Sequence, residues 1–443
     1  MILPLANRSD PIWKEKFSNI STVTPEIKKL VKDMLETLEL TSGVGLAAPQ
    51  VKHAYRLFIV RYGRLKEVFI NPKIISLGKE SDAIEEGCLS VPGVRGVVNR
   101  FTQVTLDYLD IKGRQKRAQV SGYYARIVQH EYDHLSSTFY INRITDKDKI
   151  YTYKPIKIVY FGTSTFGAII LKTIYGQHLV GEYDLQLIVT APNKPAGRGK
   201  KIVESEVGQL ASKFNLPVAK PVSLKDFRLV SQLKKLEPDF IVLASYGKII
   251  PKQILNIPKK GAVNIHPSLL PKYRGPSPIS AAILNGDKYT GVSLIQMNEK
   301  MDEGDILASI KFKIGKKDTS QTLSLKLAQV GAKLIHHVLH LIVTDKIKPV
   351  PQNHKLATYT KILTKQDGFI DWKKPPKNLE RMIRAYYPWP GVWTYYQGVE
   401  SRKQKPDKKI LKLLPNRMVQ LEGKQPVTLE EFKNGHKDFT IRL

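Results

Sequence analysis

Between residues 156 and about 345, short apolar runs alternate with stretches that suit helices, and this alternation constrains the fold more than any other feature. The first run, 156–161, ends at Gly162, as a strand does where it enters a tight turn. Strands that alternate with helices usually pair in parallel, and the helices cover the faces of the sheet. The segment therefore predicts a mostly parallel, doubly wound, Rossmann-like α/β sheet, with further strands in 185–190, 239–244, 261–266 and 291–297.

Two changes of pattern divide the 443-residue chain. A charged segment, 143–149, precedes the first apolar run, and after 346–351 the pattern changes to short strand-like pieces separated by turns. A single hydrophobic core seldom serves more than about 250–300 residues. We therefore expect three domains, and the last of them should be small and rich in β-strands. Their predicted bounds are 1–150, 151–350 and 351–443.

The charge is strongly positive and unevenly spread. The net charge is +31; residues 1–154 hold 24 Lys and Arg against 17 Asp and Glu, so a net +24 belongs to the remainder. Such an excess attracts polyanions, of which nucleic acid is the commonest, although a solubilising surface would look the same. Cys88 is the only cysteine, which excludes an intrachain disulfide and fits a reducing cytosol. The sequence contains no run of 18 apolar residues, so we expect no membrane span.

The first candidate site is a metal centre. His130, Glu131 and His134 have the HExxH spacing, which on a helix turns both imidazoles toward one metal and places the carboxylate beside a bound water. Cys88 could supply a third ligand, and three protein ligands leave a fourth position open, as in catalytic sites. The rival is a zinc peptidase, which takes its third ligand from a downstream His or Glu; the next histidine is His178.

Three segments in this order, 43–50, 86–90 and 130–134, resemble those of peptide deformylases, and the resemblance extends over residues 1–145. It implies an α+β metalloenzyme domain. It also implies that Cys88, His130 and His134 hold Fe²⁺, or Zn²⁺ or another divalent metal.

The same resemblance implies roles for four further residues. Glu131 would act as general base and then as general acid. The Gln50 amide and the Leu89 backbone N–H would stabilise the oxyanion. Gly45 would lie along the substrate peptide. One position departs from the family: a glycine usually follows two residues after the Leu of the helix end, and Ser137 stands there, at a turn.

The second candidate site lies at the end of a predicted strand. The run 263–271 delivers Asn264 and His266 to the carboxyl end of that strand, where open α/β sheets place their ligands. Asp302 follows in the segment 301–305. Together the three residues offer an amide donor, an imidazole and a carboxylate to orient it.

The strings 263–275 and 301–305 resemble those of folate-dependent formyltransferases. The resemblance implies that 10-formyltetrahydrofolate is the formyl donor. Asn264 and His266 would stabilise the oxyanion, and Asp302 would orient His266 and help proton movement. Residues predicted to line the folate pocket are Ser268, Leu269, Leu270 and Pro271.

Two features favour tRNA as the formyl acceptor. The Gly-rich basic loop 192–201, with Arg198, Lys200 and Lys201, resembles the loop that methionyl-tRNA formyltransferases insert at the acceptor stem, although a solvated loop would have the same composition. Segments 368–372 and 383–394 resemble the C-terminal, OB-like β-barrel of that family, and basic grooves on such barrels suit a phosphate backbone.

The sequence therefore predicts a bifunctional cytoplasmic enzyme. It would formylate the α-amine of initiator methionyl-tRNA and remove the formyl group from nascent peptides at the ribosome, and we expect a monomer. Three alternatives stay open: a formyltransferase with an inactive deformylase domain, a sugar-nucleotide formyltransferase fused to a metallohydrolase, and a non-catalytic RNA-binding protein. The intact metal ligands argue against an inactive deformylase domain, and the basic loop argues against a sugar-nucleotide acceptor. The two complete sets of catalytic residues argue against a non-catalytic protein.

Overall fold

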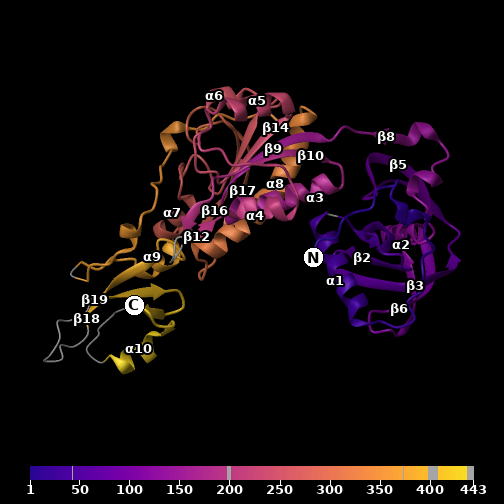
Figure 1. Cartoon of the computed structure of the whole chain (residues 1–443), viewed down its shortest axis with the longest axis horizontal. Helices are drawn as coiled ribbons and strands as arrows, with labels where there is room; N and C mark the ends of the chain where they lie inside the picture. Colours follow the sequence, from indigo (N-terminus) through magenta and orange to yellow (C-terminus); the bar gives the residue numbers. More distant parts are fainter. Residues whose placement is uncertain (42, 197–200, 373, 398–407, 437–443) are drawn as a thin grey trace. The chain divides into compact units, whose positions relative to one another are not determined.

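The structure, a computed structural model, describes residues 1–41, 43–196, 201–372, 374–397 and 408–436 (Figure 1). The chain forms two compact units. The first comprises Met1–Lys157 with Lys172–Leu185, and the second comprises Ile158–Leu171 with Gln186–Leu443. Within the described ranges, no helix is both long enough and apolar enough to cross a membrane.

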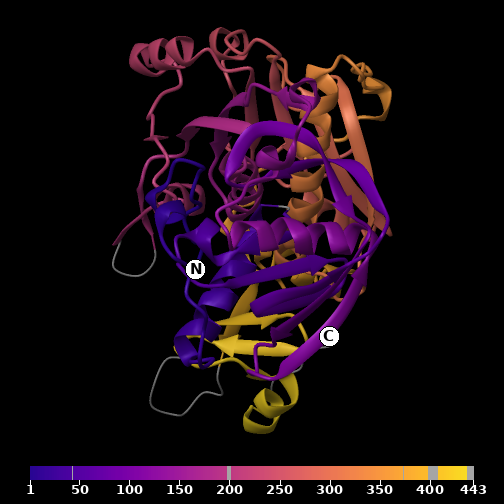
Figure 2. The ribbon, with the colours of Figure 1, turned by 90° about the vertical axis from the view of Figure 1, so that its right-hand side faces the viewer.

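The first unit combines two antiparallel sheets with two longer helices, α1 and α2 (Figure 2). One sheet has the strand order β1-β2-β3-β6-β7, and the other has the order β4-β5-β8. The elements are α1 (Pro25–Leu40), β1 (Gly45–Ala47), β2 (Leu57–Tyr62), β3 (Leu65–Leu77), β4 (Ser81–Cys88), β5 (Val91–Phe101), β6 (Gln103–Leu109), β7 (Gln115–Ser121), α2 (Gly122–His134) and β8 (Ile150–Thr152).

Helix α1 shows how local sequence starts an element. Thr24 caps it by accepting a hydrogen bond from the Ile27 N–H, and Pro25 fits the first turn, where a backbone N–H has no helical partner. Its buried side chains recur at helical spacing, from Ile27 to Leu38, and contact the edge strand β1 and its neighbour β2. Burial of this stripe holds α1 against the sheet.

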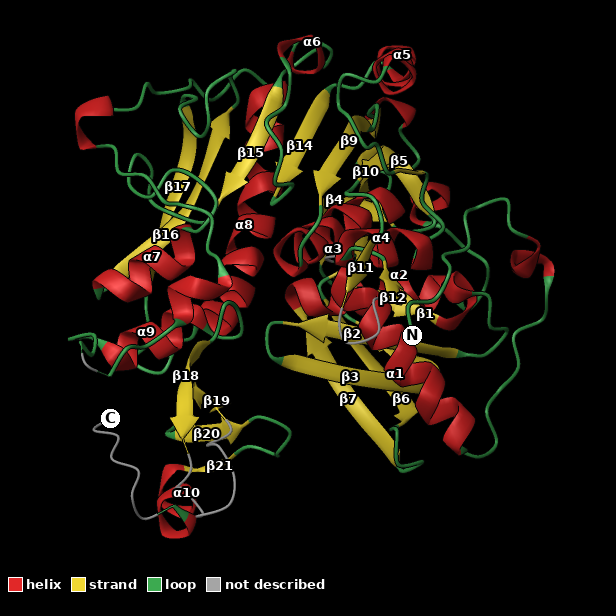
Figure 3. Cartoon of the chain, turned by 60° about the vertical axis from the view of Figure 1, so that its left-hand side comes forward, coloured by secondary structure: helices red, strands yellow, loops and turns green. Residues whose placement is uncertain are grey.

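A mixed seven-stranded sheet in the order β13-β10-β9-β14-β15-β16-β17 lies mainly in the second unit, although the first residues of β9 and β10 are counted with the first (Figure 3). β10 pairs with β13, and β14 with both β9 and β15, in parallel, whereas β16 and β17 are antiparallel to their neighbours. The strands are β9 (Ile156–Gly162), β10 (Tyr183–Val189), β13 (Val218–Ala219), β14 (Phe240–Ala244), β15 (Ala262–His266), β16 (Tyr289–Gln296) and β17 (Ile306–Lys313).

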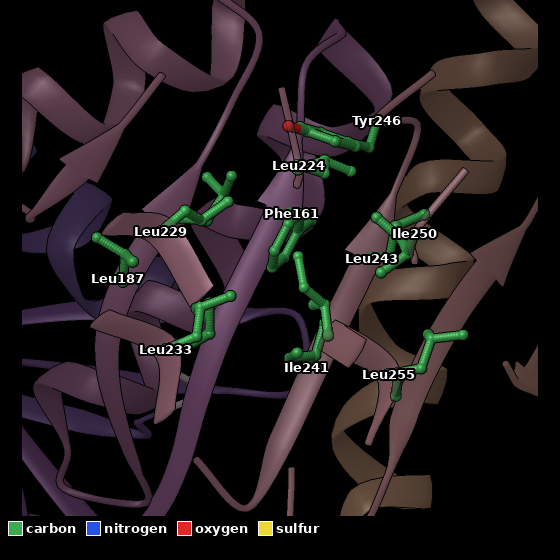
Figure 4. Close-up of a cluster of buried hydrophobic side chains, with 14 residues drawn as sticks. Phe161, Leu187, Leu224, Leu229, Leu233, Ile241, Leu243, Tyr246, Ile250 and Leu255 are labelled. Atoms are coloured by element: carbon green, nitrogen blue, oxygen red, sulfur yellow. The ribbon is translucent and has the colours of Figure 1, made fainter. Parts of the chain in front are cut away.

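The alternation seen in the sequence is confirmed, because each predicted run overlaps one of these strands. Apolar side chains of β9 and β14 contact α5 and α6 in one core cluster, which includes Phe161 and Ile241 (Figure 4). The antiparallel edge made by β16 and β17 is the part of the sheet that the alternation did not reveal. The helices of this region are α3 (Thr165–Leu179), α4 (Glu206–Lys213), α5 (Phe227–Leu236), α6 (Lys252–Leu255), α7 (Pro278–Asn285) and α8 (Ser320–Val343).

The end of the chain is a small β-rich region, as predicted. Its described strands form one antiparallel sheet in the order β18-β19-β20-β21. The elements are α9 (Leu379–Tyr386), β18 (Val392–Gln397), β19 (Lys408–Leu414), β20 (Met418–Leu421), β21 (Val427–Thr428) and α10 (Leu429–Gly435). The predicted domain bounds stay predictions, but β8 pairs with β5, so the sheet of the first unit reaches Thr152.

Candidate functional site

The predicted metal ligands come together in the first unit. Helix α2 carries His130 and His134 one turn apart, and Cys88 ends β4. One ligand atom from each of the three lies within 4.8 Å of the others, and Cys88 Sγ is 3.3 Å from His134 Nε2. This spacing fits three ligands around one ion, and Cys88, not a downstream His or Glu, completes the set among the described residues.

The surroundings of the two histidines prepare them for a metal. Burial, together with the nearby His130 and Arg100, holds the pKa of His134 well below its usual range, so that its ring is neutral, as a ligand must be. His130 directs Nδ1 to Glu86 Oε2 at 2.8 Å, which fixes the ring and leaves Nε2 for a ligand role. His134 Nδ1 is buried and has no hydrogen-bond partner in the described part of the chain.

A buried ionic network holds Glu86 in place. Arg100 donates to both of its carboxylate oxygens at 2.7 and 2.9 Å, and Arg126 donates to Oε1 at 2.8 Å. Burial works to raise the pKa of Glu86, but the hydrogen bonds with His130 and Arg100 outweigh it and hold that pKa well below its usual range. Arg100 also binds Asp133 on α2. The sequence showed the positions of these residues but gave no sign that they form this support.

Glu131 lies beside the ligands with its carboxylate buried. Burial raises its pKa to about 7, which suits a group that must both take and give a proton near neutral pH. Its Oε2 has no hydrogen-bond partner among the described residues. Gly45, in β1, leaves room for it: a Cβ at position 45 would lie 2.3 Å from Glu131 Oε1. The glycine therefore leaves the space that the Glu131 carboxylate occupies.

The predicted oxyanion donors lie next to the thiol. The Gln50 side chain is 1% exposed; its Oε1 accepts from the Ala47 N–H, and its Nε2 lies 3.5 Å from Cys88 Sγ and 3.4 Å from Ser90 Oγ. Leu89 lies in the tight turn between β4 and β5. Ser137 has a φ of 53°, in the left-handed region that glycine adopts readily, so the predicted turn is confirmed.

In the second unit, β15 positions two of the three predicted residues. Asn264 and His266 are two residues apart on this strand, so their side chains share one face. Asn264 Nδ2 donates to Asp302 Oδ1 at 3.1 Å, and His266 Nδ1 lies 3.5 Å from Asp302 Oδ2. The predicted Asn–His–Asp group is thus one contiguous cluster. His266 Nε2 lies 2.9 Å from the carbonyl oxygen of Tyr273, which can only accept, so Nε2 donates there.

Asp302 occupies a left-handed turn between β16 and β17, with φ 55°. Its Oδ2 accepts from the Gly275 N–H at 2.7 Å. The turn is close to the end of β16, because a Cβ at Gly304 would lie 1.9 Å from the Gln296 carbonyl oxygen. The Asp302 carboxylate is therefore held by the Gly275 N–H and by the close packing of its turn against the end of β16.

The predicted folate segment is buried against β16. Ser268 is fully buried, and its hydroxyl donates to the Lys272 carbonyl at 2.6 Å. Ser293 binds the segment twice, by donating to the Ser268 carbonyl and by accepting from the Leu270 N–H. The role of residues 268–271 toward folate stays a prediction. In the basic loop, Arg198 and Lys200 lie outside the described residues, as does the side chain of Lys201; β11 (Lys194–Ala196) and β12 (Lys201–Val203) form the hairpin that bears them.

Three families match along the chain. Residues 2–150 match the polypeptide deformylase family, residues 156–339 the formyl transferase family, and residues 362–416 the formyl transferase C-terminal domain. A methionyl-tRNA formyltransferase of Alkaliphilus oremlandii is 35% identical over 300 residues, which are 65% of this chain and 95% of that protein. The chain belongs to the methionyl-tRNA formyltransferase family. Ahead of that part it carries a peptide deformylase domain.

Further relatives and solved structures are similar to parts of the chain. A methionyl-tRNA formyltransferase of Roseiflexus castenholzii is 43% identical over 243 residues, or 55% of this chain and 77% of that one. Among solved structures, the peptide deformylase of Thermotoga maritima is 32% identical and covers 33% of this chain and 99% of its own, with a TM-score of 0.32. A class I type b deformylase of Acinetobacter baumannii is 36% identical and covers 32% and 99%, with a TM-score of 0.31. The metal ligands lie within the deformylase match, and the Asn–His–Asp cluster lies within the formyltransferase match.

Proposed function

We propose that the chain catalyses two opposite formyl reactions of protein synthesis. The second unit would transfer the formyl group of 10-formyltetrahydrofolate to the α-amine of initiator methionyl-tRNA. The first would hydrolyse the formyl group from the N-terminus of new polypeptides. The observation that carries the proposal is that each family match contains its own complete group of reactive side chains, Cys88–His130–His134 with Glu131, and Asn264–His266–Asp302.

The ligand set fits a divalent metal, Fe²⁺, Zn²⁺ or another, which would supply a hydroxide nucleophile near neutral pH. Glu131 takes the proton of the attacking water and passes it to the leaving amine, as its raised pKa allows. The Gln50 amide and the Leu89 N–H stabilise the charge that develops on the formyl oxygen. The products are formate and a free N-terminal amine.

In formyl transfer, the α-amine attacks the formyl carbon, and the formyl oxygen gains negative charge. The bond to the folate nitrogen then breaks, and tetrahydrofolate leaves with the proton that the amine loses. The Asn264 amide nitrogen carries two hydrogens. It donates one in a hydrogen bond to Asp302, so the other is available to donate to the formyl oxygen. His266 would stabilise the same charge once its Nε2–H turns from the Tyr273 carbonyl to the formyl oxygen, and Asp302 orients the imidazole through Nδ1. Residues 268–271 would line the folate site.

The acceptor would be held by positive charge. The loop with Arg198, Lys200 and Lys201 would contact the acceptor stem, and the C-terminal region, as an OB-like barrel, would bind the tRNA backbone. The net +24 beyond residue 154 supports this arrangement. We also propose that the chain acts as a monomer near the ribosome, where formylated chains emerge.

One experiment tests the whole proposal. The purified chain is incubated with 10-formyltetrahydrofolate and methionyl-tRNA, and separately with a formyl-methionyl peptide, while formate release is measured. An amino-sugar nucleotide replaces the tRNA in a third assay. We expect activity in the first two. Formylation of the sugar nucleotide alone, or no peptide hydrolysis by metal-loaded protein, would support one of the alternatives instead.

The acceptor role of the loop has its own test. Changing Arg198, Lys200 and Lys201 together to Ala should weaken methionyl-tRNA formylation about tenfold or more and reduce the salt dependence of tRNA binding, because phosphate contacts release counterions. Changing the exposed residues Lys213, Lys234 and Lys235 to Ala removes the same charge elsewhere. If both triple variants behave alike, the loop makes no specific contact.

A further inference from the structure

A short segment that follows the catalytic sheet, residues 352–360, is bound to the Asn–His–Asp cluster; we call it the strap. Before it, Val350 exchanges two backbone hydrogen bonds with Ile306 at the start of β17. After it the chain continues into the C-terminal region. Its backbone is held beside Arg274, whose N–H donates to the Thr358 carbonyl at 2.8 Å and whose carbonyl accepts from the Thr360 N–H at 2.7 Å.

The Arg274 guanidinium, which is completely buried, makes the main side-chain contacts with the strap. It donates twice to Gln352 Oε1, at 3.2 and 2.8 Å, and to the Tyr359 hydroxyl at 3.0 Å. Glu303, next to Asp302, neutralises it at 3.1 Å. A buried charge that is fully hydrogen-bonded in this way holds its partners in one arrangement, because loss of a partner leaves an uncompensated charge.

Gln352 connects this charge to the catalytic turn. While its Oε1 accepts from Arg274, its Nε2 donates to the carbonyl oxygens of Asp302 at 2.8 Å and Gly304 at 2.7 Å. Asp302 has a positive φ, a conformation that a non-glycine residue keeps where its neighbours support it. The two hydrogen bonds from Gln352 hold the backbone of the turn in the conformation that gives Asp302 its positive φ.

We propose that Arg274 and Gln352 are positioning residues for formyl transfer: through the strap they fix the turn that presents the Asp302 carboxylate to Asn264 and His266. The inference rests on the proposed formyltransferase function. Neither side chain reaches the reacting atoms. They act by keeping the Asp302 oxygens at 3.1 Å from the Asn264 amide and 3.5 Å from the His266 ring.

The test substitutes Gln352→Glu in the full chain. Glutamate has the same shape and still accepts from Arg274, but it cannot donate to the Asp302 and Gly304 carbonyls. We expect kcat for methionyl-tRNA formylation to fall about tenfold or more, while the KM values for tRNA and 10-formyltetrahydrofolate change less than about twofold. A merely structural role would instead lower the amount of active protein without a change in kcat per active site.

Two further variants and one internal standard complete the experiment. Tyr359→Phe removes one hydroxyl from the network, which lies 3.0 Å from Arg274 and 3.1 Å from Glu303, and should lower kcat by a smaller factor. Leu356→Ala alters an exposed, uncharged side chain of the same strap and should match the wild type. Peptide deformylation by the same samples reports the amount of active first unit, and thermal unfolding together with 10-formyltetrahydrofolate binding reports the folded fraction of the second, so Tyr359→Phe carries the test if Gln352→Glu does not fold.

The outcomes separate the two ideas. An active wild type, with Gln352→Glu and Tyr359→Phe at the wild-type kcat or with only KM raised, would overturn the positioning role and leave the proposed function standing. A folded wild type that formylates no methionyl-tRNA would contradict the proposed function and the positioning role with it.

Discussion

At the scale of single residues, the metal centre makes the clearest demands. Cys88→Ala removes one of three ligands, so we expect metal content to fall well below one ion per chain and deformylation to be lost. Glu131→Gln removes the proton carrier but spares the ligands, so it should keep the metal and lose turnover. Elemental analysis and formate release measure both. Undiminished metal in Cys88→Ala would contradict the assignment.

Gly45 is the second residue with a sharp requirement. Gly45→Ala would place a methyl group 2.3 Å from Glu131 Oε1, far inside van der Waals contact. The carboxylate must then turn away, so we expect deformylation to fall at least tenfold, or about 1.4 kcal/mol in transition-state stabilisation, with metal content unchanged. Wild-type turnover in this variant would show that Glu131 has freedom that the structure does not show.

Local patterns predicted which side chains come together in the two candidate sites. His130 and His134 follow from helix spacing, Cys88 is the only thiol, and Asn264 and His266 come from one strand end. The supporting residues could not be predicted in the same way. Arg274 and Gln352 are 78 positions apart and meet only through the fold, and Glu86 becomes a partner of His130 only when β4 reaches α2.

At the scale of elements, the start of α8 depends on a buried carboxylate. Asp318 accepts from the Gly315 N–H at 2.8 Å, from the Thr322 hydroxyl at 3.0 Å and from Lys326 at 2.6 Å. Burial alone would raise its pKa, but the hydrogen bonds with Lys326 and Gly315 outweigh burial and lower it from its usual value. The folded state therefore favours the ionised form.

Asp318→Asn should thus lower stability in a pH-dependent way. A lowered folded-state pKa contributes stability above the unfolded-state value of about 3.9, and that stability is lost as pH falls through the folded-state value. At pH 7 we expect a loss of about 1–2 kcal/mol in the free energy of unfolding, and a smaller loss in acid. Denaturant titrations at several pH values measure it. An equal loss at every pH would mean that the charge contributes nothing.

The elements also show where sequence reasoning succeeds. Each of the five runs predicted as strands in 156–297 overlaps a strand, because short apolar runs bounded by turns are typical of buried strands. The antiparallel direction of β16 and β17 was not predictable from the same pattern, since direction depends on the connections rather than on the side chains of a strand.

At the scale of the whole molecule, the two reactive groups belong to separate units. Cys88, His130 and His134 lie in the first, and Asn264, His266 and Asp302 in the second. Each has its own buried support. We therefore expect His266→Ala to abolish formylation and spare deformylation, and Glu131→Gln to do the reverse. Both variants are assayed for both reactions. A loss of more than about tenfold in the other activity, roughly 1.4 kcal/mol of coupling, would contradict independence.

The strap has a consequence for recombination between related genes. A cut between residues 350 and 351, where composition changes, would separate Gln352 from Arg274 and from the Asp302 turn that it holds. In a chimera joined there, the residue at position 352 would come from one parent, and Arg274 and Asp302 from the other. The residue at position 352 would then not be matched to the turn that it supports, even if the sheet folded correctly. Residues 352–360 therefore belong functionally with the sheet that precedes them, so an exchange point would have to lie beyond Thr360, where the last hydrogen bond to Arg274 is made.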